Sequence, residues 1–399
     1  MKVEKLLDVV QIKNPKPEKF SGEKRYYSTG NINEHNVSEN FELVKFENRP
    51  SRANVEPIEN SVGFAKMKST AKTLLVTKNY SECIFSTGMN FLLPSENIIS
   101  KYLYYYLISP YFLDLKDKYS GQGIMGGLSN KDLNLFKIPV PSLDEQEKIV
   151  KKLDKLHESR IYYKKIKNSE LVYYDKMYES LLNEVFQKLI SAFPNVLLKE
   201  KTYIAGRIGW KGLSKKDYKE EGPLFINVSS LNHGQYVNFQ ESKHISEQRY
   251  FESENIGLVE GDVLICKDGS IGKIGIVGKL EELATVNSSL LIVRSLEGLM
   301  PKYLYYVFAS PQFQLIVKSR IEGSTVPHLY QRDIKNFSIP LPPLEVQKES
   351  VKKLDRLYEL IQDIKKNVEL IQKGNDNLFK SVLKTEFSYE WNRDKSRVN

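Results

Sequence analysis

The sequence predicts an α+β protein in which two similar domains are separated by two long helices that pair as an antiparallel coiled coil. Two observations carry this prediction. The junction Ile138-Pro-Val-Pro141 reappears as Ile339-Pro-Leu-Pro342, and 11 of the 19 aligned positions of 138–156 and 339–357 are identical. Heptad-like apolar spacing then follows each copy. A chain of 399 residues with 41% hydrophobic residues can fill two cores.

The chain is an internal duplication. The segment Lys101-Tyr-Leu-Tyr-Tyr answers to Lys302-Tyr-Leu-Tyr-Tyr at the same shift of 201 positions, and the register holds without a gap from about Phe64 to His157. This period is far longer than the roughly 20 to 50 residues of a solenoid repeat. Each copy is therefore predicted to be a domain with its own core, and the two to be related by a pseudo-twofold axis.

The segment after the second junction has the pattern of one long helix over 344–387. Its apolar residues recur in steps of three and four, with one asparagine among them, which is typical of a coiled-coil seam. The predicted seam residues of this helix are Leu354, Leu357, Ile361, Ile364, Val368, Ile371, Asn375 and Leu378.

A first long helix is predicted over 143–190. It begins at the capping box Ser142-Leu-Asp-Glu145, ends before Pro194, and has the seam residues Leu153, Leu156 and Leu181. A single helix with an apolar stripe is unstable in water, so the two helices are predicted to pack on each other. The alternative is that each helix only covers its own domain.

These patterns divide the chain into a first domain, 1–142, a first spacer helix, 143–190, a second domain, 191–343, a second spacer helix, 344–387, and a tail, 388–399. In the first domain, strands are expected at 41–46, 73–76 and 89–93, with a helix at 101–119. In the second, strands are expected at 223–229, 261–266 and 273–277, with a helix at 302–320. Each domain is thus a small α+β unit.

Composition excludes several classes of protein. No apolar stretch approaches the eighteen residues that span a bilayer, and the N-terminus lacks a signal-peptide core, so we expect no membrane partner and a cytoplasmic protein. The two cysteines, Cys83 and Cys266, cannot form a disulfide framework and are expected to be buried. The net charge of +9 favours a polyanionic partner, although many proteins without one carry a similar excess.

No catalytic or metal-binding pattern is complete. Ser69-Thr-Ala-Lys72 matches a penicillin-binding motif but lacks its companion motifs, and Gly269-Ser-Ile-Gly-Lys273 lacks the hydroxyl residue of a P-loop. The five histidines have no metal-ligand spacing, and an adenine-methyltransferase motif is missing. We therefore predict no catalytic residue, no metal site and no cofactor on this chain.

Duplicated polar residues instead indicate a nucleic-acid surface. Lys66, Ser69 and Lys72 answer to Lys267, Ser270 and Lys273 on a hairpin, and lysine and serine are ordinary phosphate ligands. Polar stretches at 28–33 and 227–232, and at 121–128 and 322–329, also occupy matching places and could reach base edges. The alternative is a set of solvated hairpins and turns. The candidate contacts are Ser28, Thr29, Asn31, Lys66, Lys68, Ser69, Lys72, Arg207, Lys211, Ser229, Ser230, Lys267, Ser270 and Lys273.

With these junctions, the glutamines Gln146 and Gln347 and the two long helices, the chain resembles the specificity subunit of type I restriction-modification enzymes over essentially its whole length. Gly261-Asp-Val-Leu-Ile-Cys-Lys-Asp-Gly-Ser270 also resembles the target-recognition strand and turn of that family. The first copy departs from it, with Ala65-Lys-Met-Lys-Ser69 in place of the second copy's turn.

The resemblance implies a non-catalytic reader of double-stranded DNA. Its two target-recognition domains would each read half of a split site, and the differing turns imply an asymmetric target. The helices would dock two methyltransferase subunits, and restriction subunits would join through the complex. S-adenosylmethionine, ATP and Mg²⁺ would bind only to those partners. From the residues alone, a two-headed protein adaptor on a coiled-coil spacer remains the rival, which a salt titration of binding would distinguish.

Overall fold

A computed structural model describes residues 2–33, 37–121, 126–206, 217–231, 234–252, 256–322 and 327–388. The chain forms two compact units, each of which takes part of both long helices. Unit 1 comprises Met1–Asn168 and Val368–Asn399, and unit 2 comprises Ser169–Asn367. The predicted α+β class is confirmed, while the division into five segments stays a prediction.

Unit 1 is built on two four-stranded sheets, with strand orders β2-β9-β6-β7 and β4-β3-β8-β5, and a two-stranded pair of β1 with β10. Its elements are β1 (Lys2–Lys5), α1 (Leu6–Val9), β2 (Val10–Ile12), β3 (Lys24–Tyr27), η1 (Thr29–Asn31), β4 (Glu42–Val44), β5 (Ala53–Val55), β6 (Val62–Ala65), β7 (Thr73–Leu75), α2 (Lys78–Ser81), β8 (Ile84–Ser86), β9 (Met89–Pro94), α3 (Ser100–Leu107), α4 (Pro110–Tyr119), η2 (Asp132–Leu135), β10 (Lys137–Val140) and α5 (Leu143–Ala192).

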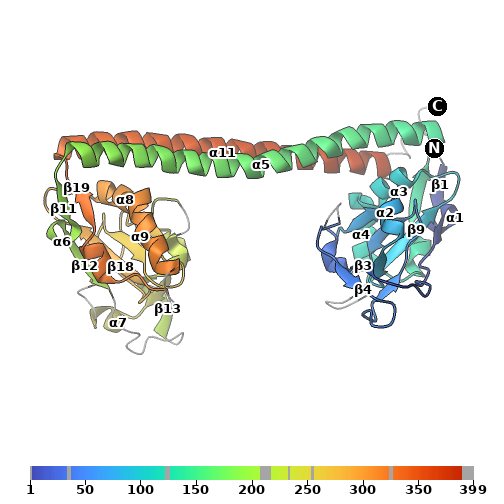
Figure 1. Ribbon diagram of the computed structural model, residues 1–399, viewed down its shortest axis with the longest axis horizontal. Helices are drawn as coiled ribbons and strands as arrows, with labels where there is room; N and C mark the ends of the chain where they lie inside the picture. The colour runs from blue at the N-terminus through green and yellow to red at the C-terminus, as the bar shows by residue number, and fades with distance from the viewer. Residues whose placement is uncertain are drawn as a thin grey trace. The chain divides into compact units, whose positions relative to one another are not determined.

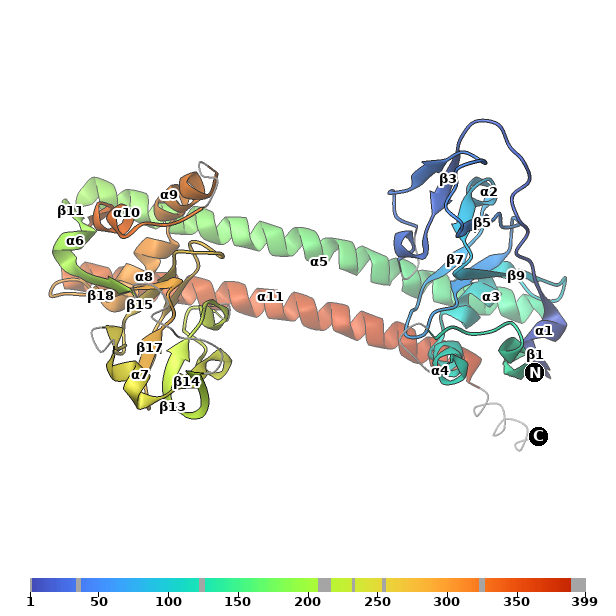
Figure 2. The ribbon, with the colours of Figure 1, turned by 90° about the horizontal axis from the view of Figure 1, so that it is seen from below.

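Unit 2 has sheets of order β12-β18-β15-β16 and β14-β13-β17, and pairs β11 with β19. Helix α8 packs on β15, β16 and β18, and Figure 2 shows it beside β15 and β18. Its elements are β11 (Asn195–Leu197), α6 (Leu198–Lys201), β12 (Thr202–Gly206), β13 (Tyr218–Ile226), η4 (Val228–Leu231), η5 (Phe239–Glu241), β14 (Lys243–Ile245), α7 (Glu247–Phe251), β15 (Val263–Cys266), β16 (Ile274–Ile276), β17 (Ala284–Val286), β18 (Leu290–Ser295), α8 (Pro301–Ala309), α9 (Pro311–Glu322), α10 (Gln331–Lys335), β19 (Ser338–Pro340) and α11 (Leu344–Phe387).

Strand register confirms the duplication. In β6 and β7, Gly63 pairs with Leu74, and in β15 and β16, Leu264 pairs with Gly275, at the shift of 201. The parallel pairing of β3 with β8 is also repeated by β13 with β17. Cys83 and Cys266 are both buried, as predicted. The two units are therefore copies of one backbone arrangement.

The predicted single helices at 101–119 and 302–320 are wrong, because each is two helices. The break falls at Ser109-Pro110 and at Ser310-Pro311. Proline inside a helix removes a hydrogen bond and clashes with the preceding turn, but it suits the first helical position. In both copies the serine caps the second helix: the hydroxyl of Ser109 accepts from the Phe112 amide at 3.2 Å, and that of Ser310 from the Phe313 amide at 3.4 Å.

The repeated proline junction is explained by a buried glutamine in the first turn of each long helix. Gln146 and Gln347 are both 0% exposed. The side-chain oxygen of Gln146 accepts from the Ile99 amide at 2.9 Å, and that of Gln347 from the Met300 amide at 2.9 Å. Each side-chain nitrogen donates to two carbonyls, those of Asn97 and Pro141 in unit 1 and of Gly298 and Pro342 in unit 2. One amide thus ties the helix start, the proline and the preceding loop together.

The long helices run side by side along each unit (Figure 1), and ion pairs show that they are antiparallel. In unit 1, Lys152 pairs with Glu386 at 2.7 Å and Arg160 with Asp376 at 2.5 Å. In unit 2, Asp175 pairs with Lys365, and the rings of Tyr178 and Tyr358 lie 5.9 Å apart. Partners descend along α11 as they ascend along α5, so the predicted antiparallel pairing is confirmed within each unit.

Both long helices also pack against the domain cores. The alternative role, in which a long helix covers a domain, therefore occurs together with helix pairing. Phe387 of α11 packs on Tyr102 of unit 1, with ring centroids 5.1 Å apart. At the matching positions of unit 2, Phe186 of α5 packs on Tyr303, with ring centroids 5.8 Å apart. Each domain therefore buries the end of one long helix and the start of the other.

The predicted seam is correct in part. Leu153, Leu354 and Ile361 are at most 1% exposed. Half-buried positions are Leu156, Leu181, Leu357, Ile364, Val368 and Asn375.

Two predicted seam positions, Ile371 and Leu378, are wrong, because they are 53% and 51% exposed. Phe379 and Leu383 are buried in their place, and Phe387 follows one turn later. A straight helix of 3.6 residues per turn drifts by about 20° per heptad from a repeat of 3.5. Over the last turns of α11 the buried face has therefore moved by one position.

Candidate nucleic-acid interface

The site is built on one hairpin turn in each unit. Turn 1, residues 66–72, joins β6 to β7, and turn 2, residues 267–273, joins β15 to β16. Lys66 opens turn 1: its amide donates to the Gly88 carbonyl at 3.0 Å, and its carbonyl accepts from the Leu128 amide at 2.9 Å. Lys267 opens turn 2 with the same two bonds, to Ser289 at 2.8 Å and from Leu329 at 3.1 Å. The first residue of each turn is therefore held by equivalent backbone bonds.

Turn 1 meets the other polar stretches that the sequence singles out in unit 1. The ammonium of Lys72 donates to the Thr29 carbonyl at 2.6 Å. Lys68 donates its amide to the Gly126 carbonyl at 3.1 Å. The candidates of 28–33, 66–72 and 126–128 therefore form one surface. Residues 122–125 lie outside the described residues.

Two of the candidates shape this surface. The carboxamide oxygen of Asn31 accepts from the amide of Ser28 at 2.8 Å and from its hydroxyl at 2.7 Å. These two side chains therefore close the short η1 turn and present the Thr29 carbonyl to Lys72. Thr29 itself is half-buried.

In unit 2, turn 2 meets the stretch that ends at Leu329, whose amide donates to the Lys267 carbonyl at 3.1 Å. Separately, the Asn287 carboxamide lies 3.5 Å from that of Asn227. Ser229 is exposed. Ser230, however, is 0% exposed and its hydroxyl lies 3.3 Å from that of Ser242. The prediction that Ser230 contacts DNA is wrong, because its side chain faces the interior of the turn. Arg207 and Lys211 lie outside the described residues.

The lysines of the two turns differ in exposure. Lys68 and Ser69 are exposed on turn 1, as are Ser270 and Lys273 on turn 2. Lys66 is half-buried, and its burial lowers the pKa of its ammonium. Lys72 and Lys267 are also half-buried. Each turn thus combines an exposed hydroxyl with an exposed ammonium, a pair suited to a phosphate.

The tips of the turns carry different chemistry at equivalent places. At the tip of turn 1, Met67 forms a backbone bridge with Gly127. At the matching positions of turn 2, the carboxylate of Asp268 lies 2.5 Å from Nδ1 of His328. Asp268 retains 42% side-chain exposure in this pair. A carboxylate accepts hydrogen bonds from the amino group of cytosine, whereas methionine offers only apolar contact.

Sequence reasoning missed a group of side chains next to Asp268. The rings of His328 and Tyr330 lie 4.7 Å apart, and the guanidinium of Arg332 lies 4.7 Å from the Tyr330 ring. Tyr330 and Arg332 are exposed or partly exposed. Aromatic and guanidinium groups are common contacts of nucleic acids. The polar stretch 322–329, aligned with 121–128, included His328 but ended before Tyr330 and Arg332.

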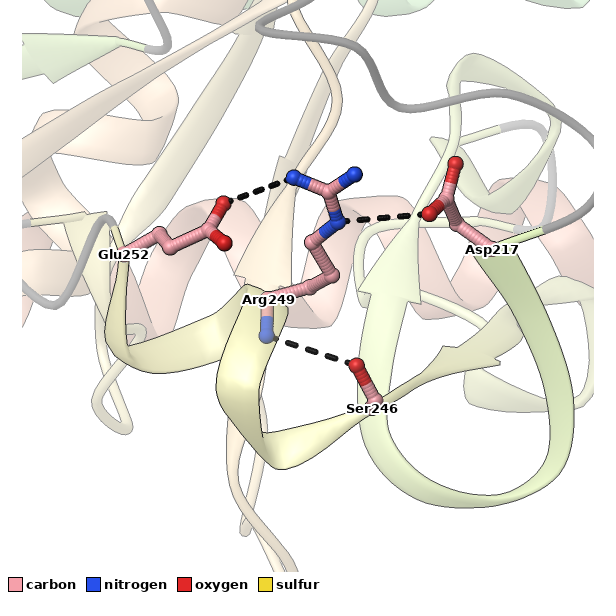
Figure 3. Close-up of polar contacts among 4 residues, drawn as sticks. All are labelled: Asp217, Ser246, Arg249 and Glu252. Atoms are coloured by element: carbon pink, nitrogen blue, oxygen red, sulfur yellow. Dashed lines mark hydrogen bonds and ion pairs between the residues drawn. The ribbon is translucent and has the colours of Figure 1, made fainter.

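Arg249, a basic residue of unit 2, forms ion pairs with two acidic residues. As Figure 3 shows, Arg249 of α7 lies between Asp217 and Glu252. Its Nε donates to Asp217 at 3.2 Å and its Nη1 to Glu252 at 2.9 Å. The bond to Glu252 raises the pKa of the guanidinium further. Arg249 therefore joins α7 to the residue that precedes β13, and its charge is balanced by carboxylates.

Two other kinds of site do not occur in the described ranges. No group of three or more histidine, cysteine or acidic side chains there could hold a metal ion. Within the same ranges, each helix is too short or too polar to cross a membrane.

The family model for the type I restriction modification DNA specificity domain matches residues 1–173 and 209–371. The EcoKI specificity subunit of Escherichia coli (strain K12) is 23% identical over 334 residues, which cover 77% of this chain and 69% of that protein. The EcoBI specificity subunit of Escherichia coli is 24% identical over 327 residues, covering 74% of this chain and 66% of that protein.

Solved structures share the fold. The HsdS subunit from Thermoanaerobacter tengcongensis aligns with a TM-score of 0.59 at 20% identity, covering 97% of this chain and 96% of that one. A chain from a study of assembly and conformational transition in the type I R-M system aligns with a TM-score of 0.76 at 19% identity, covering 96% and 97%. The chain therefore belongs to the type I restriction-modification DNA specificity family and is a non-catalytic specificity component.

Proposed function

We propose that this protein reads a bipartite, asymmetric DNA sequence, with turn 1 and its neighbours on one half-site and turn 2 and its neighbours on the other. The observation that carries the proposal is the meeting of polar segments at each turn, of turn 1 with Thr29 and residues 126–128 in unit 1, and of turn 2 with His328 and Leu329 in unit 2. Phosphate contacts position a protein on DNA and base contacts specify sequence. Each surface offers groups for both tasks.

The asymmetry of the target follows from the tips of the turns. The backbone bonds of Lys66 and Lys267 are the same, so the tips reach equivalent places on equivalent scaffolds. Met67 then faces one half-site and Asp268 the other. An apolar thioether and a carboxylate favour different base edges. The two half-sites therefore differ in sequence.

The paired helices supply the surface for protein partners in this proposal. Two methyltransferase subunits dock there, and restriction subunits join through the complex. S-adenosylmethionine, ATP and Mg²⁺ are held by those subunits, and the complex works in the cytoplasm. Support comes from the names of the relatives, which are subunits of type I restriction enzymes.

The decisive experiment maps methylated adenines in DNA exposed to the chain assembled with its methyltransferase subunits. The expected result is one split motif with two different halves. The same complex should lose DNA affinity steeply as salt rises, because phosphate neutralisation releases counterions. Binding that is indifferent to salt, with no motif in the methylation map, would instead support a protein adaptor.

A further inference from the structure

A lysine of α4 is buried beneath turn 1. Lys116 is 1% exposed, although lysine is almost never fully buried without partners. Its ammonium donates to the carbonyls of Met67 at 2.9 Å and Thr70 at 2.5 Å. The Thr70 hydroxyl lies at 3.2 Å and the Ala65 carbonyl at 3.4 Å. All of these acceptors belong to turn 1 or to the last residue of β6.

The same place in unit 2 is apolar. The duplication aligns Lys116 with Val317 and Thr70 with Ile271. Val317 is 3% exposed and belongs to the core of unit 2, against which Ile271 packs. Gly272 fits closely there, because a Cβ on it would lie 2.5 Å from Cγ1 of Val317. Ile271 and Gly272 of turn 2 therefore pack on the apolar core around Val317, with one neutral hydrogen bond from Gln314 of α9 to the Gly272 carbonyl at 3.3 Å, whereas turn 1 rests on a buried charge.

The conformation of turn 1 shows why it uses such an anchor. Ser69 has a φ of +56°, a left-handed conformation that glycine adopts more readily, and turn 2 has Gly269 and Gly272 in that region. The amide of Ser69 donates to the Asp117 carboxylate at 2.8 Å. Two adjacent residues of α4 thus hold turn 1. Lys116 binds its carbonyls, and Asp117 binds the amide of Ser69.

We propose that Lys116 is a positioning residue for DNA recognition: its buried ammonium orders the carbonyls of turn 1 and so fixes Lys66, Lys68 and Ser69 against the first half-site. The second half-site does not depend on a buried charge. This inference rests on the proposed function, because it assigns a role to a residue that does not itself reach the surface. An ammonium has three donors for this ring of oxygens, whereas a neutral amine has two and turns a lone pair toward one of them.

Burial lowers the pKa of Lys116 to about 8, against a smaller opposing effect of Asp117. The charged groups on α4 and turn 1 are Asp114, Asp117 and Lys118 on α4 and Lys66, Lys68 and Lys72 on turn 1, and among them Asp117 opposes the shift. Because the unfolded state binds this proton more tightly, its loss between pH 8 and 10.5 raises the global stability. The ammonium has one more donor than the neutral amine, but desolvation of the charge is the larger effect. Opening of turn 1 also returns Lys116 to water, so the same linkage raises the protection of turn 1 over this pH range.

The test compares Lys116→Met with Val317→Met in the full chain, since the two changes place the same side chain at matching positions. The rate of amide hydrogen exchange is measured in turn 1 (66–72) and in turn 2 (267–273) of each variant. The unaltered turn of the same chain is the internal reference. Lys116→Met is expected to raise exchange in turn 1 about tenfold and leave turn 2 unchanged. Val317→Met should spare turn 1. Lys116→Arg, which keeps the charge, should restore much of the protection.

The wild-type chain provides a second measurement that does not depend on any variant folding. As pH rises from 7 to 9.5, protection of turn 1 should rise relative to turn 2, because opening of turn 1 restores the ordinary pKa of Lys116. In the assembled complex, Lys116→Met should lower discrimination at the first half-site about tenfold and leave the second intact.

Equal protection of turn 1 in wild type and Lys116→Met overturns the inference. Loss of protection with intact discrimination also overturns it, because turn 1 would be ordered by Lys116 without reading DNA. Failure of the wild-type complex to bind DNA would instead overturn the proposed function, and with it this inference.

Discussion

Turn 1 and turn 2 share their backbone and differ in their support. Both are opened by a lysine with the same two backbone hydrogen bonds. Beneath turn 1 lies the ammonium of Lys116, and beneath turn 2 lies Val317 against Gly272. The comparison shows that the two copies have kept the same backbone conformation at the start of each turn. The side chains beneath the turns and on their exposed faces have diverged. Under the proposed function, such divergence would let one scaffold read two sequences.

The largest expected difference between the units lies in the helix seam. Ile361→Glu in unit 2 places a charge at a position that is 1% exposed, and should lower the free energy of unfolding by about 3–5 kcal/mol. Ile371→Glu in unit 1 changes a side chain that is 53% exposed and should alter it by less than about 0.5 kcal/mol. Urea denaturation of the two variants measures both. Equal losses would contradict the drift of the buried face along α11.

Unlike the turns, the junctions at Gln146 and Gln347 should contribute equally to the stability of the two units. Gln146→Leu and Gln347→Leu each leave one amide and two carbonyls without their partner. A buried unsatisfied group costs about 1–3 kcal/mol, so we expect a loss of about 2–4 kcal/mol for each variant. Thermal unfolding gives the values. A large cost at one junction with none at the other would show that the two copies no longer use the glutamine alike.

The tips of the turns should differ in base recognition. Asp268→Ala removes a carboxylate, and should relax the second half-site at one position by about 1–3 kcal/mol of discrimination. Met67→Ala at the matching tip is the control for that position, and should leave the second half-site unchanged. Methylation mapping of both variants reports the motif directly. An unaltered second half-site in Asp268→Ala would remove this carboxylate from base recognition.

The smallest expected difference concerns the lysines, which should act alike in both units. Lys66→Ala with Lys72→Ala, and Lys267→Ala with Lys273→Ala, should each weaken binding to all DNA sequences. Removing one lysine–phosphate interaction lowers the slope of log K against log salt by about 0.9, so removing a pair lowers it by up to about 1.8. Salt titrations of the two double variants should therefore run parallel. An unchanged slope in either would place that pair away from the phosphates.

Much of the fold was predictable because its signals are local and repeat along the chain. The proline junctions, the heptad spacing of α11 and the ungapped register from 64 to 157 can all be read without a partner residue. These signals identified the duplication, the long helices and the hairpins on which the candidate site stands. They failed at Ser109-Pro110 and Ser310-Pro311, where a continuous apolar pattern outweighed the proline in the prediction.

Only the tertiary structure decided which side chains meet. His328 reaches Asp268 across 60 positions, and Lys116 reaches Met67 across 49. Such pairs arise from the way strands and helices pack, and no spacing rule along the chain contains them. The same holds for Ile371 and Leu378, whose exposure follows from the gradual rotation of a straight helix relative to its partner. The sequence by itself determined the repeated frame, because periodicity is local, and packing decided the site, because contacts are not.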